Sequence, residues 1–139
     1  MNSAGLGAND ISVIAGIDDP DYKLQFWKGE YFSVGNGKEK FISRLIYPVP
    51  EQNNVGLGIH TTTDNFGRLK LGPNTFYLED CKLDYSVDEG RRKEFYNAVK
   101  DFLPFIELDD LNPDYSGIRP KLQSNGQGER DFIIVNEVG

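Results

Sequence analysis

Residues 24–34 read L-Q-F-W-K-G-E-Y-F-S-V, and this stretch decides the class of fold. Aromatic and β-branched side chains in such density favour β-strands. Residues 41–49 and 55–63 have the same character, and the turn sequences G-N-G at 35–37 and Q-N-N at 52–54 separate the three stretches. The simplest prediction is therefore a meander of antiparallel strands.

Shorter strands are predicted along the rest of the chain. Residues 68–71 follow an N-F-G turn and form a short fourth strand. Residues 107–116 are acidic and rich in turn formers, so we expect a loop there. A strand over residues 117–122, interrupted by Pro120, and a last strand with an apolar run at 131–135 complete the prediction.

Two helices are predicted between these strands. Asn9 or Asp10 caps a short first helix, since both side chains accept hydrogen bonds from backbone N–H groups at a helix start. The second helix follows S-V-D-E at 86–89, which matches a capping box, and Pro104 ends it. Apolar residues recur at helical spacing within it, namely Phe95, Ala98, Val99, Phe102 and Leu103.

Strands outnumber helices and follow one another in runs, a pattern typical of the α+β class with a mostly antiparallel sheet and a few flanking helices. At 139 residues the chain is predicted to be a single domain, residues 1–139. It begins on a glycine-rich turn, N-S-A-G-L-G at 2–7, and ends two residues after Glu137. We therefore expect it to be a fragment of a longer domain.

Composition narrows the functional classes. The formal net charge is −7, which lacks the electrostatic footprint of a nucleic-acid-binding protein. Cys81 is the sole cysteine, so neither an intrachain disulfide nor a multi-cysteine metal site can form. We expect no metal site. A reducing compartment fits best, with the cytoplasm as the default location, and no apolar run reaches the length of a membrane span.

Three positions are chemical candidates from pattern alone, each with a structural alternative. His60, the only histidine, lies in a predicted strand on the face that also carries Gly58. A lone strand histidine is more often structural than catalytic. Tyr47 precedes Pro48 and lies at a sheet edge lining a cleft or simply at a rigid strand end. Arg119, held extended by the following proline, either binds a carboxylate or forms a surface salt bridge.

Six short motifs occur in an order that resembles a known family. They are N-S-A-G-L at 2–6, K-G-E-Y-F at 28–32, Y-P-V-P at 47–50, G-L-G-I-H-T-T at 56–62, L-G-P at 71–73 and P-D-Y-S-G-I-R-P-K-L at 113–122. The chain resembles the C-terminal half of the L-2-hydroxyglutarate dehydrogenase/oxidase group, within the D-amino-acid-oxidase-like superfamily of flavoproteins. The resemblance covers nearly the whole chain.

This resemblance implies an enzyme that transfers a hydride from the carbon bearing a substrate hydroxyl to FAD, while a base takes the hydroxyl proton. It implies that His60 is the general base or a substrate contact and that Arg119 binds the substrate carboxylate. Further contacts to the small 2-hydroxy-acid substrate are implied for Tyr31, Tyr47 and Lys121. A turn near the FAD is implied for Asn2, Ser3, Ala4 and Gly5.

The chain also departs from the family pattern, because the N-terminal unit with G-x-G-x-x-G is absent. We expect residues 1–17 and 114–139 to lie nearest that missing FAD-binding half. Alone, the chain is then expected to be inactive and to hold no FAD tightly, and its exposed apolar surface should promote self-association. The family resemblance is also compatible with a complete enzyme that associates peripherally with a membrane. The alternative is a stand-alone, non-catalytic module that binds a small carboxylate or a protein partner.

Overall fold

The computed structural model of the protein describes residues 1–49, 58–128 and 130–136. Its contacts divide the chain into two compact units. The first contains residues 1–27, 77–83 and 118–139, and the second contains residues 28–76 and 84–117. Each unit is described here by itself.

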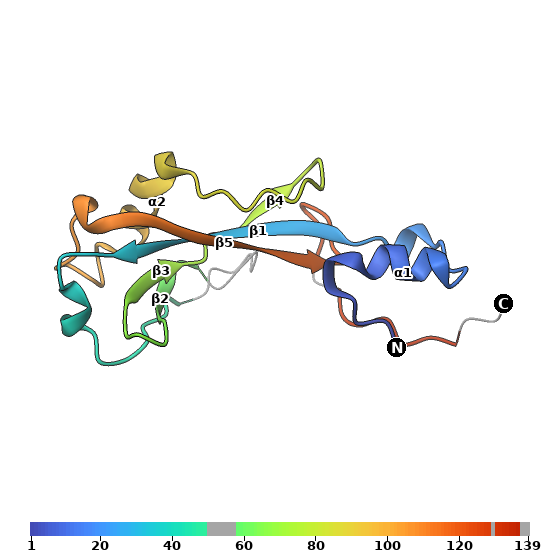
Figure 1. Ribbon diagram of the computed structural model, residues 1–139, viewed down its shortest axis with the longest axis horizontal. Coiled ribbons are helices and arrows are strands. Elements are labelled where there is room, and N and C mark those ends of the chain that lie inside the picture. The colour runs from blue at the N-terminus through green and yellow to red at the C-terminus, as the bar shows by residue number, and fades with distance from the viewer. Residues whose placement is uncertain (50–57, 129, 137–139) are drawn as a thin grey trace. The chain divides into compact units, whose positions relative to one another are not determined.

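An antiparallel sheet dominates the described residues (Figure 1). Its strands are β1 (Gln25–Val34), β2 (His60–Thr63), β3 (Leu69–Gly72), β4 (Phe76–Leu78) and β5 (Leu111–Lys121). Their order is β2-β3-β1-β4, and β5 also pairs with β1. The helices are α1 (Ala8–Ile14) and α2 (Arg92–Val99). The α+β class with a mostly antiparallel sheet is thus confirmed.

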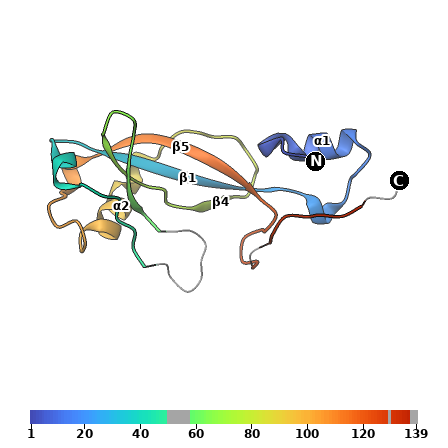
Figure 2. The same cartoon turned by 90° about the horizontal axis from the view of Figure 1, so that it is seen from below.

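Buried and half-buried side chains alternate along β1, and the buried ones form part of the core of the second unit. Phe32 and Val34 point to one face of the sheet and are buried, while the intervening Ser33 is only half-buried. Helix α2 packs on this face, and the rings of Phe32 and Phe95 lie 4.5 Å apart (Figure 2). Full burial of a phenylalanine side chain stabilises a fold by roughly 2–3 kcal/mol. Phe32→Ala would therefore leave a costly cavity under the sheet.

The strand order corrects the predicted meander. β1 pairs with β3, with Phe32 opposite Leu71, rather than with the stretch that follows it in sequence. This register places two large apolar side chains together on the core face. The predicted strand over 41–49 was wrong: a 3-10 turn, Lys38–Phe41, begins the segment, and the described residues after it form no strand. Ile46 still exchanges backbone and side-chain hydrogen bonds with Thr61.

Other boundaries also differ from the prediction. Within residues 55–63 only β2 is a strand among the described residues, and residues 55–57 lie outside them. β5 begins at Leu111, inside the segment predicted to be a loop, and it contains Pro113 and Pro120. No strand occurs over 131–135, and β4 was not predicted. Pairing with β1 stabilises β5 against its unfavourable local sequence.

Both helices were predicted, but their caps differ. Gly7 precedes α1, which follows the 3-10 turn Gly5–Gly7, and the Asn9 side chain instead accepts a hydrogen bond from Leu24 N. A 3-10 turn, Glu89–Arg91, leads into α2, and the carboxylate of Asp88 accepts from Gly90 N at 2.9 Å. Ser86 was therefore the wrong cap. Its N–H and hydroxyl both donate to Asp84.

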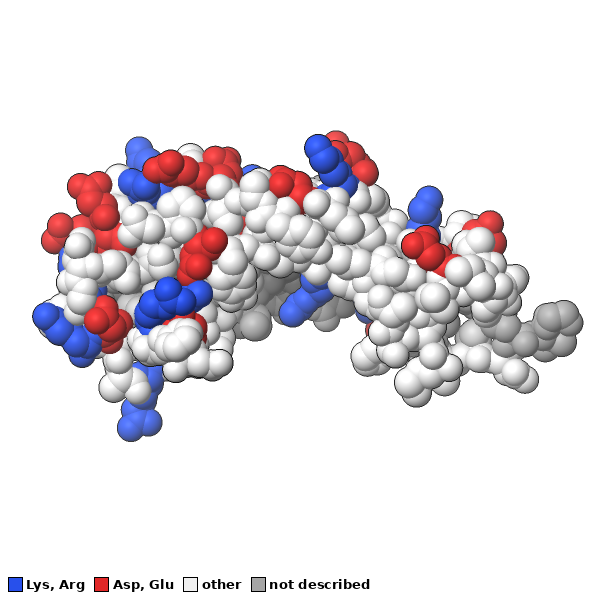
Figure 3. Space-filling model, in the orientation of Figure 1, with Lys and Arg blue, Asp and Glu red and all other residues white. Residues whose placement is uncertain are grey.

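On the face shown in Figure 3, acidic and basic side chains are interspersed rather than gathered into patches of one sign. None of the helices in the described ranges has the length and apolarity to cross a membrane. Among those same residues, no group of three or more His, Cys, Asp or Glu side chains could hold a metal ion.

Candidate functional site

His60, Gly72 and Tyr31 come from three neighbouring strands and form one row across the sheet. The register places His60 of β2 opposite Gly72 of β3. Because Phe32 is opposite Leu71, Tyr31 of β1 falls opposite Gly72 from the other side. Residues in one such row point to the same face, and here that is the face opposite the apolar core. We name His60, Gly72 and Tyr31 the His60 row.

Gly72 allows this row to be compact. A Cβ at position 72 would lie 2.7 Å from Tyr31 Cδ1 and 2.7 Å from the carbonyl oxygen of Glu30. The Gly72 φ of +140° is also a conformation that other residues rarely adopt. The ring of Tyr31 therefore lies against the backbone of β3 at Gly72.

His60 has a defined hydrogen-bond role. Its side chain is buried in the sheet, and Nδ1 lies 2.9 Å from the carbonyl oxygen of Gly58. A carbonyl oxygen can only accept, so Nδ1 carries the proton of the neutral ring and Nε2 is left as the acceptor. Tyr47 stacks on the imidazole with ring centroids 4.3 Å apart. The predicted residues His60, Tyr47 and Tyr31 all belong to the second unit.

The sequence analysis missed the residues beside Tyr31. The ring of Tyr115 on β5 stacks on Tyr31 at 4.4 Å with an interplanar angle of 10°. Lys70, which is buried on β3 two residues from Gly72, lies 4.7 Å above the Tyr115 ring and pairs with Asp114 at 2.7 Å. The motif P-D-Y-S-G contains both Asp114 and Tyr115. Only the pairing of β1 with β5 could have shown their place.

The remaining predicted substrate residues, Arg119 and Lys121, belong to the first unit. Both lie on β5, so the extended conformation predicted for Arg119 is confirmed. The Arg119 side chain is exposed. Lys121 Nζ lies 4.9 Å above the ring of Trp27, whose Nε1 donates to the carbonyl oxygen of Gln123. Their contacts with a substrate stay predictions.

The predicted cofactor turn, Asn2 to Gly5, is an exposed segment of the first unit. The Asn2 side chain organises it, because Oδ1 accepts from Ala4 N and Nδ2 donates to Ala8 O and Ser12 Oγ. Gly5 has a φ of +58°, and the space where its Cβ would lie is open. This small, open turn fits close approach by a flavin, although its four residues carry no charge for the phosphates.

The sequence of this antiparallel sheet and its flanking helices matches a known protein family. A family model described as "FAD dependent oxidoreductase" matches residues 1–138. The chain belongs to this family, the DAO family of flavoproteins. The family resemblance of the sequence motifs is thereby confirmed.

Within this family the chain is similar to L-2-hydroxyglutarate dehydrogenases. It is 35% identical to the mitochondrial enzyme of Arabidopsis thaliana, over 99% of this chain and 30% of that protein. It is 34% identical to the enzyme of Indibacter alkaliphilus, over 99% of this chain and 42% of that protein. The chain thus spans less than half the length of these relatives.

A solved structure shares the fold. Dithionite-reduced L-alpha-glycerophosphate oxidase from Mycoplasma pneumoniae, with FAD bound, superimposes with a TM-score of 0.69 at 19% identity. The match covers 86% of this chain and 30% of the oxidase chain. The chain therefore shares the fold of a region of this oxidase.

Proposed function

We propose that this chain is the substrate-binding portion of an FAD-dependent oxidoreductase that oxidises a 2-hydroxy acid such as L-2-hydroxyglutarate. The His60 row is the observation that carries the proposal: it places His60 and Tyr31 on the same face of the sheet, on either side of Gly72. Similarity to dehydrogenases of that substrate supports the choice of substrate.

In this proposal His60 is the general base. When bound, FAD supplies the acceptor for the hydride from the carbon that bears the hydroxyl. His60 Nε2 takes the hydroxyl proton, since Nδ1 is already engaged with Gly58 O. Stacking on Tyr47 keeps the imidazole plane in one orientation. Tyr31, supported from behind by Tyr115, forms the other wall of the substrate position.

Two further groups complete the proposal. Arg119 binds the substrate carboxylate, because a guanidinium can donate two parallel hydrogen bonds to it, and Lys121 adds positive charge nearby in sequence. The open turn of Asn2, Ser3, Ala4 and Gly5 contacts the flavin.

We further propose that the 139-residue chain alone is inactive and binds FAD weakly, because it contains no G-x-G-x-x-G segment for the pyrophosphate.

An absorbance spectrum of the purified chain, with and without FAD and then with L-2-hydroxyglutarate, tests the proposal. We expect no tightly bound flavin. A bound flavin that bleaches on adding the hydroxy acid would show that the chain is active by itself. The non-catalytic module would be favoured instead if the chain bound a small carboxylate and this binding did not depend on flavin, in this chain or in any longer form of the protein.

The role of His60 is tested in a flavin-loaded protein that carries this chain. Loss of a general base commonly costs about 10²- to 10⁴-fold in rate, so we expect His60→Gln to lower kcat by that factor. Thr62→Ser is a matched control because Thr62 follows two residues later on β2, on the same face. Equal rates for His60→Gln and the control would exclude His60 as the base.

A further inference from the structure

Two charged side chains are buried on the side of the sheet opposite the His60 row. Lys28 and Glu30 of β1 have side chains only 4% and 1% exposed. They point to the face opposite Tyr31, because successive strand residues alternate. Burial of a charge is unfavourable unless partners compensate it. We therefore expect the buried Lys28 and Glu30 side chains to have compensating partners and a structural or functional role.

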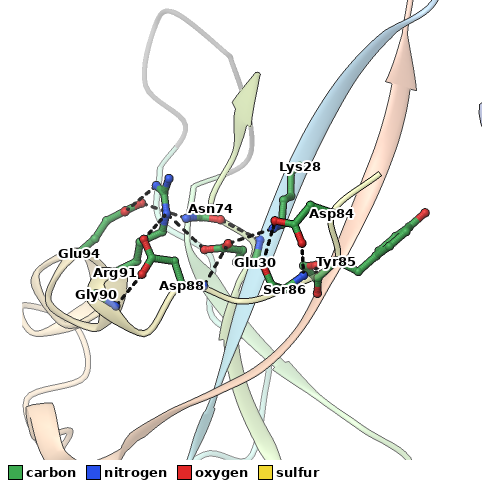
Figure 4. Close-up of polar contacts among 11 residues, drawn as sticks. Lys28, Glu30, Asn74, Asp84, Tyr85, Ser86, Asp88, Gly90, Arg91 and Glu94 are labelled. Carbon is green, nitrogen blue, oxygen red and sulfur yellow. Dashed lines mark hydrogen bonds and ion pairs between the residues drawn. The ribbon is translucent and has the colours of Figure 1, made fainter. Parts of the chain in front are cut away.

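The carboxylate of Glu30 is surrounded by donors (Figure 4). Oε1 accepts from Asp88 N at 3.3 Å and lies 3.5 Å from Lys28 Nζ. Oε2 lies 3.4 Å from Arg91 Nε, and this contact is an ion pair without hydrogen-bond geometry. The Arg91 guanidinium is itself fixed, since it lies 4.2 Å over the Phe76 ring. Electrostatic attraction thus anchors Glu30 to the segment that begins α2.

Asn74 anchors the backbone of Glu30. Glu30 N donates to Asn74 Oδ1 at 2.8 Å, and Asn74 N donates to Glu30 O at 3.3 Å. The Asn74 side chain is completed by a 3.3 Å hydrogen bond from Nδ2 to Glu94 Oε1. Asn74 lies two residues beyond the end of β3. It therefore continues the attachment of β3 to β1 after the regular ladder has ended.

Residues 29–31 of β1 and residues 72–74 are packed tightly against each other. A Cβ at Gly29 would lie 2.7 Å from Pro73 Cβ, and a Cβ at Gly72 would lie 2.7 Å from both Glu30 O and Tyr31 Cδ1. Residues 29–31 and 72–74 thus touch backbone to backbone. Any displacement of Glu30 would be passed to Tyr31 in the same strand and to Gly72 across the gap. Gly72 in turn is the register partner of His60.

We infer that Glu30, held by Asn74 and Arg91, is a positioning residue that sets the placement of Tyr31 and His60 on the opposite face of the sheet. This inference rests on the proposed function only in assigning the substrate to that face. Glu30 does not touch substrate. Its role is to fix where the groups that do so lie.

Nuclear magnetic resonance of the 139-residue chain tests the inference, because His60 is its only histidine and its ring signals are unambiguous. In Glu30→Gln we expect the ring resonances of His60 and Tyr31 to shift and amide exchange at Asn74 to rise about tenfold. Glu89→Gln is the matched control, since Glu89 is 72% exposed and pairs only with Arg92 among the described residues. It should leave these signals unchanged. Unshifted His60 and Tyr31 rings in a folded Glu30→Gln chain would overturn the inference.

A second variant decides the matter if Glu30→Gln does not fold. The Arg91 side chain is 33% exposed and lies outside the sheet, so Arg91→Gln is expected to remain folded. It should shift the same two rings. Unchanged rings in folded Arg91→Gln, or unfolding of both variants, would show a purely structural cluster. None of these measurements uses flavin or substrate, so failure of the proposed oxidation would be seen separately, in turnover.

Discussion

Tyr31 lies so close to Gly72 that a Cβ at position 72 would be 2.7 Å from Tyr31 Cδ1. This contact joins β1 to β3 in the row that also contains His60. A side chain at position 72 would have to displace either the tyrosine ring or the strand. The absence of a side chain at Gly72 thus leaves room for the Tyr31 ring in the row that also contains His60.

Gly72→Ala is expected to destabilise the chain and displace Tyr31. Overpacking of a tight site costs about 1–3 kcal/mol, and the φ of +140° adds strain. Urea unfolding measures the change in free energy. Gly117→Ala is the matched control, since Gly117 also lies in a strand and nothing lies within 4 Å of its Cβ position. Equal midpoints for the two variants would contradict the packing argument.

Asp110→Asn is expected to lower the free energy of unfolding. The buried Asp110 carboxylate receives hydrogen bonds from Lys38 Nζ at 2.6 Å, Asn36 Nδ2 at 2.6 Å and Glu107 N at 2.7 Å. Hydrogen bonds to a charged group contribute roughly 1.5–3 kcal/mol, and an amide cannot replace the charge. Asp109→Asn, one residue earlier and exposed, should be near neutral. A loss at position 109 as large as that at 110 would argue against the buried cluster.

The same carboxylate predicts how stability depends on pH. Burial alone would raise the pKa of Asp110, but the hydrogen bonds from Lys38, Asn36 and the Glu107 backbone outweigh it and lower the pKa. When folding lowers the pKa of a carboxyl group, the charged carboxylate stabilises the folded state at pH values above its usual pKa of 3.8. This stabilisation is lost as the pH falls through the pKa of the folded state. Between about pH 5 and 2, the free energy of unfolding should therefore change less with pH in Asp110→Asn than in the unchanged chain. An unchanged pH slope would refute the assignment.

Asp84 should titrate far below an ordinary aspartate. The backbone N–H and the hydroxyl of Ser86 donate to it, and Lys28 lies close, so that its pKa is lowered from 3.8 to about 2. Ser86→Ala removes the hydroxyl donor and should raise this pKa, which a carboxyl NMR titration measures directly. The stabilisation from Asp84 is present above pH 3.8 and is lost as the pH falls toward 2. No change in Ser86→Ala would assign the shift to other groups.

The chain is expected to associate with itself through apolar side chains near its C-terminus. Phe132 is 90% exposed and Ile134 is 92% exposed. Exposed apolar side chains promote association when they form a patch on the surface. Sedimentation velocity over a range of concentrations should show association that Phe132→Ser with Ile134→Ser reduces. Phe66→Ser, which changes a single exposed ring in a turn, should have no such effect.

The sequence by itself determined the elements whose signal is local. The density of aromatic and β-branched side chains in residues 24–34 is enough to predict β1, and apolar spacing is enough to predict α2. The ordered motifs also identified the family, which the match over residues 1–138 confirms. His60 and Tyr31 could be nominated because both lie within those motifs.

Only the tertiary structure decided how these elements combine. Which strand pairs with β1 depends on burying Phe32 against Leu71, two residues far apart in the chain. That pairing places Gly72 and Lys70 of β3 beside β1, and the separate pairing of β5 with β1 brings Tyr115 to Tyr31. Pairing with β1 also makes β5 a strand despite its prolines. Contacts between distant segments outweigh local preference because most of the free energy of folding comes from burial rather than from propensity.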